Sequence, residues 1–206
     1  MRLLLATHNR KKLVELARIV TEAGGAGVEL VDLDDVPSYP EPIEDGATFT
    51  DNALLKARSG AAASGLPTVA DDSGLVVDAL NGMPGVLSAR WAGRAKNDDD
   101  NLQLVLDQVH DVPDGRRGAA FVCVAAYVTP AGEELVVEGR LDGTLARAPR
   151  GANGFGYDPI FVPVGEERTV AELGDEWKSH TSHRARAVQA LLGQAGGLLG
   201  RAASGG

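Results

Sequence analysis

Hydrophobic and polar positions in the opening part of the chain follow two different periods. Residues 2–6 are mostly apolar and predict a buried strand. Apolar residues then recur at helical spacing from Leu13 to Val20, which predicts a helix that ends at Gly24-Gly25. A second strand is predicted over Val28–Asp32, and an acidic, proline-rich loop follows it. The opening therefore predicts a strand, a tight turn, a helix and a second strand.

A second helix is predicted after this loop. Its inward face would be formed by small residues and one leucine, namely Ala53, Leu54, Ala57 and Ala61. Thr48 or Thr50 is placed to cap this helix, and Asp51 lies in its first turn.

The middle of the chain predicts a third helix and a hairpin. The helix covers Asn97–Asp111, with Asn97 as its cap, and the aspartates at 98–100 suit the positive end of the helix dipole. Two apolar runs, Ala119–Val128 and Glu134–Gly139, are joined by a short polar turn and predict a β-hairpin.

The last part of the chain predicts one more strand and one more helix. A glycine-rich loop from Gly151 enters the strand, and the helix begins near Thr181 or Ser182. Residues 194–206 form a Gly/Ala-rich tail that we expect to fray. Because strands and helices are interleaved at first and hairpin-like later, the predicted fold class is α/β, with a mixed central sheet flanked by helices.

Composition and charge narrow the classes of function. The 206 residues suffice for one compact domain, and the one cysteine, Cys123, lies in an apolar run that predicts a buried, inert thiol. The net charge of −9 argues against nucleic-acid binding, but not against a small phosphate ligand held by local cations or by Mg²⁺. Neither a signal-peptide pattern nor an apolar run of about 20 residues occurs. We therefore expect a cytoplasmic protein without a membrane partner.

The segment around two adjacent aspartates is the most informative stretch of the chain. Thr68–Ala70 predicts a short strand, Asp71 and Asp72 then lie on a small-residue turn, and Leu75–Leu80 resumes the strand. Adjacent carboxylates repel each other and are costly to bury, so we expect the pair to face solvent, a cation or a reacting proton. From this segment alone, a solvated Asp-Ser-Gly turn is an equally good interpretation.

A phosphate site is predicted between the first strand and the first helix. Cations in the first turn of a helix oppose its dipole at a cost of about 0.3–1 kcal/mol each, which an anionic ligand would offset. The strand, turn and helix resemble a phosphate cradle of backbone N–H groups, although the P-loop motif is absent. The candidate residues are Thr7, His8, Asn9, Arg10, Lys11 and Lys12. The alternative is that the three cations extend into solvent.

Three carboxylates suit a magnesium ion. Glu44, Asp71 and Asp72 supply hard oxygen ligands, and Mg²⁺ commonly takes one or two carboxylates while water and substrate phosphates complete its shell. If one aspartate holds the ion while another accepts a proton from water, the pair serves hydrolysis at phosphorus. Asp78 is close in sequence, but we expect its side chain to face solvent.

A second group of candidate residues suits a nucleobase. Lys178, His183 and Arg184 lie around the start of the last helix, and the fixed N–H donors of an arginine favour a carbonyl over an amino group on a ligand. Phe155 and Tyr157 lie in a glycine-framed loop where an aromatic ring could stack on a base. A surface arginine and ordinary aromatic packing are the alternatives.

Six motifs occur in the order found in a known family. They are ATHNRKK, FTDNALLKA, ADDSGL, GMPGVLSARWAG, GFGYDPIF and KSHTSHR, and they extend from residue 2 to about residue 193. They resemble the motifs of the inosine/xanthosine triphosphate pyrophosphatases, the RdgB/HAM1 family of non-canonical purine nucleoside triphosphatases. The resemblance implies one ITPase-like domain over residues 1–193, made of two lobes with a nucleotide cleft between them. It also implies a homodimer and Mg²⁺-dependent hydrolysis of ITP, dITP, XTP and dXTP to the monophosphate and pyrophosphate.

The resemblance also implies roles for single residues. Triphosphate binding falls on Thr7, Asn9 and Lys12, with Lys56 as a further phosphate contact. The general base falls on Asp72, which is also a metal ligand, with Glu44 as a second metal ligand and Ser73 near the substrate. Recognition of the base falls on Phe155, Gly156, Tyr157, Asp158, Lys178, His183 and Arg184.

The mechanism that follows is attack by water on the α-phosphorus. Asp72 would accept the proton of that water, while Lys12 and the helix N–H groups would neutralise the departing pyrophosphate. Two other functions stay open at this point. One is a pyrophosphatase with the related Maf-type fold that acts on modified pyrimidine or methylated nucleotides, and the other is a nucleotide-sensing module without turnover.

Overall fold

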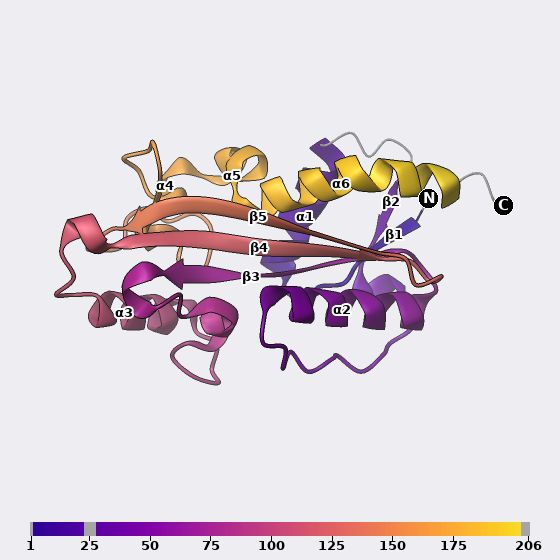
Figure 1. The fold of residues 1–206 in the computed structure, drawn as a ribbon, viewed down its shortest axis with the longest axis horizontal. Coiled ribbons are helices and arrows are strands. Elements are labelled where there is room, and N and C mark those ends of the chain that lie inside the picture. The colour runs from indigo at the N-terminus through magenta and orange to yellow at the C-terminus, as the bar shows by residue number, and fades with distance from the viewer. Residues whose placement is uncertain (1, 23–27, 203–206) are drawn as a thin grey trace. The chain divides into compact units, whose positions relative to one another are not determined.

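The computed structural model describes residues 2–22 and 28–202 (Figure 1). Its helices and strands, in chain order, are β1 (Arg2–Leu5), α1 (Arg10–Glu22), β2 (Glu29–Val31), α2 (Phe49–Ser64), β3 (Thr68–Val77), α3 (Asp98–Gln108), β4 (Gly118–Val128), β5 (Glu134–Leu145), β6 (Phe161–Pro163), α4 (Val170–Leu173), α5 (Asp175–Thr181) and α6 (His183–Ala202). The helix end predicted at Gly24-Gly25 lies outside the described residues. Within the described ranges, none of the helices combines the length and apolar character that crossing a bilayer requires.

The described strands pair in the order β2-β1-β3-β4-β5-β6. β1 runs parallel to both β2 and β3, whereas β6 runs antiparallel to β5. β4 and β5 are neighbours, and a backbone hydrogen bond from Thr129 N–H to the carbonyl of Glu133 closes the turn that joins them. Parallel and antiparallel pairs in one sheet, with helices beside it, confirm the predicted mixed α/β fold class.

The chain divides into two compact units. Unit 1 contains Met1–Asp72, Cys123–Gly139 and Arg184–Gly206, and unit 2 contains Ser73–Val122 and Arg140–His183. Strands β3, β4 and β5 contribute residues to both units. Two of the boundaries therefore fall inside predicted site segments, after Asp72 and after His183.

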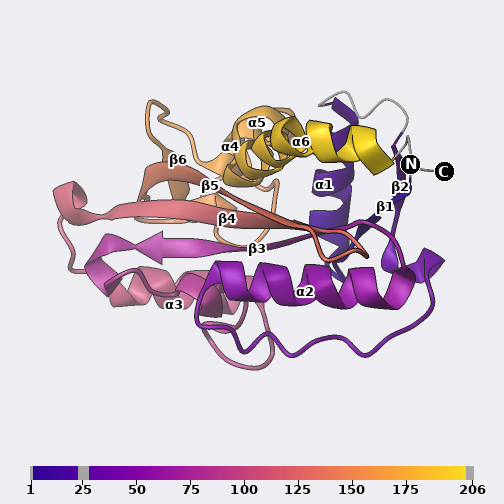
Figure 2. The ribbon, with the colours of Figure 1, turned by 45° about the vertical axis from the view of Figure 1, so that its right-hand side comes forward.

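Unit 1 has an apolar core on each face of its strands. Successive side chains of a strand point to opposite faces, and alternate residues of β4 separate accordingly. Cys123, Ala125 and Tyr127 pack with the apolar residues of α1 and α6, whereas Val124, Ala126 and Val128 pack with those of α2. Figure 2 shows α2 and α6 on opposite sides of these strands.

Helix α2 approaches its strands closely because its inner face carries small residues. Ala53 is fully buried, and a Cβ at Gly60 would lie 2.8 Å from the side chain of Thr68. The helix begins with a capping box, in which the Thr48 hydroxyl accepts from Asp51 N–H and the Asp51 carboxylate accepts from Thr48 N–H. Of the two predicted caps, Thr48 and Thr50, the structure has Thr48 as the cap.

Unit 2 is built around a single apolar cluster among its described residues. Leu102 and Val105 of α3 pack in this cluster with Phe121 of β4 and Phe161 of β6, whose ring centroids lie 4.4 Å apart. Asn97 caps α3, as predicted, because its side-chain oxygen accepts from two backbone N–H groups of the first turn.

Strand β3 differs most from the predicted elements. The sequence predicts a turn at Asp71 and Asp72, but the strand runs without a break from Thr68 to Val77, and both aspartates are buried. Gly74 suggests a turn in the sequence, yet it permits a close approach of two backbones. A Cβ at this position would lie 2.5 Å from the carbonyl oxygen of Gly85. The prediction of a turn at the pair is therefore wrong, and so is the alternative interpretation of a solvated Asp-Ser-Gly turn.

Other element ends also differ from the predicted ones. β5 continues past Gly139 to Leu145, because its last residues pair with β6. Asp78 opens a short 3-10 helix instead of extending a strand, and its side chain is exposed as expected. α6 continues to Ala202, so most of the tail that we expected to fray is helical.

Candidate active site

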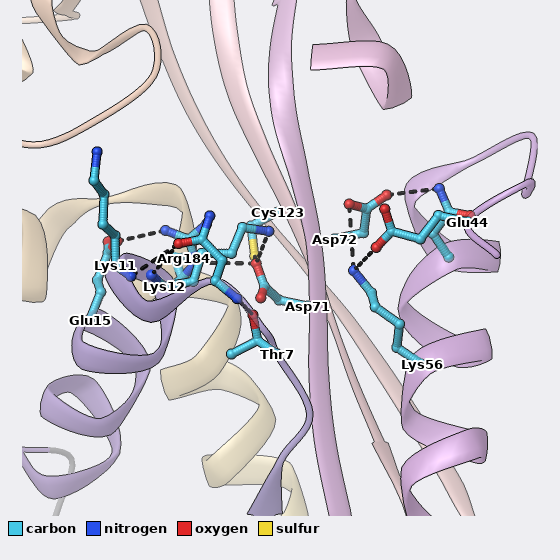
Figure 3. Close-up of polar contacts among 12 residues, drawn as sticks. Thr7, Lys11, Lys12, Glu15, Glu44, Lys56, Asp71, Asp72, Cys123 and Arg184 are labelled. Carbon is cyan, nitrogen blue, oxygen red and sulfur yellow. Dashed lines mark hydrogen bonds and ion pairs between the residues drawn. The ribbon is translucent and has the colours of Figure 1, made fainter. Parts of the chain in front are cut away.

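Strand β3 sends the side chains of its two aspartates to opposite faces (Figure 3). Asp71 points toward α1 and α6, and Asp72 points toward α2. This alternation follows directly from the extended backbone. Two neighbouring residues of the same type therefore have different partners.

Asp71 lies in a buried ion-pair network. Its Oδ2 is 3.2 Å from Lys12 Nζ and 3.2 Å from Arg184 Nε, and the residue is 1% exposed. Burial alone would raise the pKa of Asp71, but the charges of Lys12, Arg184 and Lys56 hold it well below the ordinary value. Asp71 is therefore ionised at neutral pH. Its Oδ1 has no hydrogen-bond partner among the described residues.

Arg184 extends this network to Glu15. Its Nη1 donates to Glu15 Oε2 at 2.7 Å, and both residues are almost fully buried. Glu15 was not predicted as part of the site, although it lies three residues after Lys12 and therefore on the same face of α1. That spacing is the signal that sequence reasoning missed.

Cys123 lies beside the same carboxylate. Its Sγ is 3.8 Å from Asp71 Oδ2. Burial is the main cause that raises the pKa of the Cys123 thiol, and the charge of Asp71 raises it further. The thiol therefore stays protonated at neutral pH, as the sequence predicted for a buried, inert cysteine.

Asp72 has a different environment on the other face. Asn52 Nδ2 donates to its Oδ2 at 3.0 Å, and Lys56 Nζ lies 3.8 Å from its Oδ1. Burial is the largest cause that raises the pKa of Asp72, and it outweighs the charges of Lys56 and Lys12 and the hydrogen bond from Asn52. A carboxylate with a raised pKa is a better proton acceptor than an ordinary one.

Helix α2 supplies the partners of Asp72. Asn52 and Lys56 are four residues apart, so they project from one face of the helix. Asn52 also accepts from Gly46 N–H at 2.9 Å, which fastens the end of the proline-rich loop to α2. A Cβ at Gly46 would lie 2.6 Å from that same Asn52 oxygen, so a glycine is required there. Asn52 was not among the predicted site residues.

Glu44 is held in the same group by Lys56. Lys56 Nζ lies 2.6 Å from Glu44 Oε1, and the Glu44 side chain is 35% exposed. Burial by itself would lower the pKa of Lys56, but Asp71, Asp72 and Glu44 raise it, so the ammonium stays charged. Carboxylate oxygens from two residues are the donor set that Mg²⁺ commonly takes from a protein, so the chemistry of Glu44 and Asp72 fits this ion. No group of three or more metal-ligating side chains occurs among the described residues.

The start of α1 has less free hydrogen-bonding capacity than the sequence suggested. Asn9 Oδ1 accepts from the N–H groups of Lys11 and Lys12 at 3.0 and 3.2 Å, so Asn9 acts as the helix cap. Thr7 Oγ1 in turn accepts from Asn9 N–H at 3.2 Å. A phosphate cradle that uses both capped N–H groups would require Asn9 to move. His8 is exposed, and Arg10 lies 3.8 Å from Asp34.

Unit 2 contains most of the residues predicted to recognise the nucleobase. Asp158 Oδ2 accepts from Lys178 Nζ and from Phe155 N–H, each at 2.8 Å, and Asp158 and Lys178 are both buried. Lys178 Nζ also lies 4.4 Å from the centroid of the Phe155 ring. These three residues therefore form one cluster, which brings the loop of Phe155 together with Lys178.

The other residues predicted to lie near the nucleobase or the substrate have different surroundings. The Tyr157 hydroxyl donates to the carbonyl of Ser88 at 2.8 Å, and burial raises the pKa of this hydroxyl. His183 stacks on Phe121 with ring centroids 4.8 Å apart. Ser73 is half-buried and directly follows Asp72 on β3. Arg184 belongs to unit 1, where it pairs with Glu15 and Asp71.

Comparison with known proteins assigns the chain to a family. A sequence profile of the Ham1 family matches residues 3–194. The chain belongs to the Ham1 family. This Ham1-family chain is 58% identical over 207 residues to the dITP/XTP pyrophosphatase of Corynebacterium efficiens, covering 98% of this chain and 100% of that relative. It is 62% identical over 192 residues to the dITP/XTP pyrophosphatase of Mycobacteroides abscessus, covering 93% of each.

Solved structures of similar proteins share the fold of this Ham1-family chain. The crystal structure of the nucleoside-triphosphatase, dITP/XTP pyrophosphatase, from Mycobacterium abscessus has a TM-score of 0.76 at 61% identity, covering 93% of this chain and 99% of that one. The Ham1 protein of Staphylococcus aureus has a TM-score of 0.81 at 36% identity, with 94% and 99% covered. The family that the six motifs predicted is therefore confirmed.

Proposed function

We propose that this Ham1-family chain hydrolyses ITP, dITP, XTP and dXTP to the monophosphate and pyrophosphate and so removes them from the nucleotide pool. The observation that carries the proposal is the environment of Asp72. This carboxylate is buried, its pKa is raised, and it lies beside a charged lysine. The names of the similar proteins from Corynebacterium efficiens and Mycobacteroides abscessus support the same substrate class.

In the proposed mechanism Asp72 accepts a proton from the water that attacks the α-phosphorus. Asn52 holds one oxygen of the carboxylate, which leaves Oδ1 on the side of Lys56. Lys56 and Lys12 stabilise the negative charge that develops on the phosphate oxygens. Asp71 is ionised and paired with two cations, so it positions Lys12 and does not serve as the base.

We expect Glu44 and Asp72 to hold a magnesium ion. When bound, Mg²⁺ would polarise the phosphate oxygens and offset the charge of the triphosphate. Lys56 lies close to both carboxylates, so it would have to share them with the ion. Removal of the ion with a chelator should abolish turnover, and adding back Mg²⁺ should restore it.

We assign recognition of the nucleobase to Phe155, Lys178 and His183 of unit 2, whereas Arg184 pairs with Glu15 and Asp71 in unit 1. The Phe155 ring offers an apolar face for stacking, and the cationic side chains donate to the keto groups of hypoxanthine and xanthine. Adenine carries an amino group, itself a donor, where hypoxanthine carries a keto oxygen. The cationic donors of the protein could not form a hydrogen bond to it, which disfavours ATP. The Asp158 carboxylate fixes Lys178 and so sets the direction of its N–H groups.

An assay of pyrophosphate release tests the proposal. Purified protein should release pyrophosphate from dITP and XTP in the presence of Mg²⁺, and much more slowly from GTP and ATP. Preferential turnover of dUTP or dTTP would favour the Maf-type alternative, and binding of dITP without release would favour a sensing module. The homodimer that the resemblance implies is a separate prediction. Size-exclusion chromatography with light scattering would check it by measuring the molar mass.

A further inference from the structure

The loop assigned to the base is held at several points within unit 2. We call residues 154–157 the base loop. Asp158, the residue that follows the loop, accepts from Phe155 N–H at 2.8 Å through its Oδ2, and a Cβ on Gly154 would collide with that carboxylate. Two further hydrogen bonds join the loop to distant parts of the sequence. Tyr157 Oη donates to the carbonyl of Ser88 at 2.8 Å, and Gly156 N–H donates to Asp98 Oδ2 at 3.1 Å. Asp98, at the start of α3, therefore contacts the backbone of the base loop.

The contact distinguishes Asp98 from its two acidic neighbours. Asp98, Asp99 and Asp100 share the first turn of α3, where all three suit the helix dipole. In the described part of the chain, the side chains of Asp99 and Asp100 make no hydrogen bond or ion pair, whereas Asp98 reaches the base loop, which is 58 residues away in sequence. The helix dipole explains all three aspartates, but it does not explain this contact.

The contact is one of two hydrogen bonds to a single peptide of the base loop. The peptide between Phe155 and Gly156 is held at both ends, because the Phe155 carbonyl accepts from Asp158 N–H at 3.3 Å and Gly156 N–H donates to Asp98. Gly156 has a φ of +62°, a left-handed conformation that glycine adopts readily. Rotation of this peptide would move the backbone that carries the Phe155 ring. Without Asp98, one of the two restraints on that peptide is lost.

We infer that Asp98 is a positioning residue for nucleobase recognition and acts through the backbone of Gly156. The inference rests on the proposed function, because it takes Phe155 to be the stacking surface for the base. The proposed general base, Asp72, belongs to unit 1, whereas the contact described for Asp98 is with the base loop of unit 2. Loss of Asp98 should therefore weaken substrate binding and leave the chemical step unchanged.

The test compares Asp98→Ala with Asp99→Ala. Both variants remove one charge from the same helix turn, so they match in their effect on the dipole. For Asp98→Ala we expect the KM for dITP to rise about three- to tenfold, as for the loss of one hydrogen bond, with kcat within about twofold of the parent. Asp99→Ala should leave both constants within about twofold. Hydrogen exchange at the Gly156 amide, followed by NMR, should be faster in Asp98→Ala alone.

The outcomes separate this inference from the proposed function. Equal kinetics and equal Gly156 exchange in the two variants would overturn the inference, and so would a fall in kcat without a change in KM. If the parent protein turned over neither dITP nor XTP, the proposed function would fail, while the exchange measurement would still test the anchoring of Gly156. If Asp98→Ala did not fold, Asp98→Ser would be compared with Asp99→Ser in the same way, because a serine suits the start of a helix but its hydroxyl is one bond too short to replace the carboxylate oxygen on Gly156 N–H.

Discussion

The two faces of strand β3 give adjacent aspartates opposite properties. On one face, Asp71 pairs with Lys12 and Arg184, and its pKa is held low. On the other face, Asp72 is bonded by Asn52, lies farther from its nearest cation, and has a raised pKa. A pair of titratable groups whose environments push their pKa values apart indicates separate roles in acid–base chemistry. The difference between the two faces supports the proposal that Asp72 transfers the proton while Asp71 holds the buried ion-pair network.

Removal of the proposed general base, Asp72, should have the largest effect on turnover. Asp72→Asn keeps the size of the side chain but cannot accept the proton, so we expect kcat for dITP to fall by about 10²- to 10⁴-fold. Nucleotide affinity, measured by calorimetry, should change little. The control is Asp78→Asn, an exposed aspartate six residues later, which should retain full activity. Full activity in Asp72→Asn would remove the base assignment.

The same substitution on the other face should act mainly on stability. Asp71→Asn leaves the buried cation Arg184 and the half-buried Lys12 with less compensating charge, so the free energy of unfolding should fall by about 3–5 kcal/mol. Denaturant unfolding measures the change, and Asp78→Asn should cost less than about 0.5 kcal/mol. A loss in Asp71→Asn no larger than in this control would show that the network is not stabilising.

The pH dependence should separate the two aspartates. Because Asp72 must be deprotonated to act as the base, kcat/KM should fall with decreasing pH at a value above the ordinary aspartate pKa of 3.8. The contributions of the two aspartates to the free energy of unfolding should change in opposite directions with pH. The contribution of Asp71 is present above 3.8 and is lost as pH falls toward its lowered pKa, whereas that of Asp72 is lost as pH rises through its raised pKa. An acid limb unchanged in Asp71→Asn but absent from the residual activity of Asp72→Asn would support the assignment.

A smaller effect is expected at Asn52. Its hydrogen bond to Asp72 lowers the pKa of that carboxyl, so Asn52→Ala should move the acid limb of the kcat/KM profile to higher pH. The variant should also lose about 1–3 kcal/mol of stability, because a buried hydrogen bond is broken. An acid limb that stayed in place would mean that Asn52 orients the loop of Glu44 without affecting the base.

Local rules predicted much of the fold. Thr48 and Asn97 cap their helices as their positions indicate, and the small residues of α2 form its buried face. These features depend on residues only a few positions apart, so sequence spacing reveals them. The hairpin of β4 and β5 is recognisable for the same reason.

The burial of the two aspartates could not be predicted in this way. Their partners are distant in sequence, since Arg184 follows Asp71 by 113 residues and Asn52 precedes Asp72 by 20. A buried carboxylate is tolerated only when such partners satisfy it, and no local pattern reports them. Gly74 misled for a related reason, because a glycine needed for packing is indistinguishable in sequence from one needed for a turn.

A carboxyl-carbon NMR titration of both aspartates tests the central claim most directly. Spectra of the protein labelled at aspartate, assigned with Asp71→Asn and Asp72→Asn, would follow each group as the pH is lowered. We predict that Asp72 takes up its proton above the ordinary value of 3.8, while Asp71 stays ionised as long as the protein is folded. Protonation of Asp71 before Asp72 would contradict the assignment of their roles.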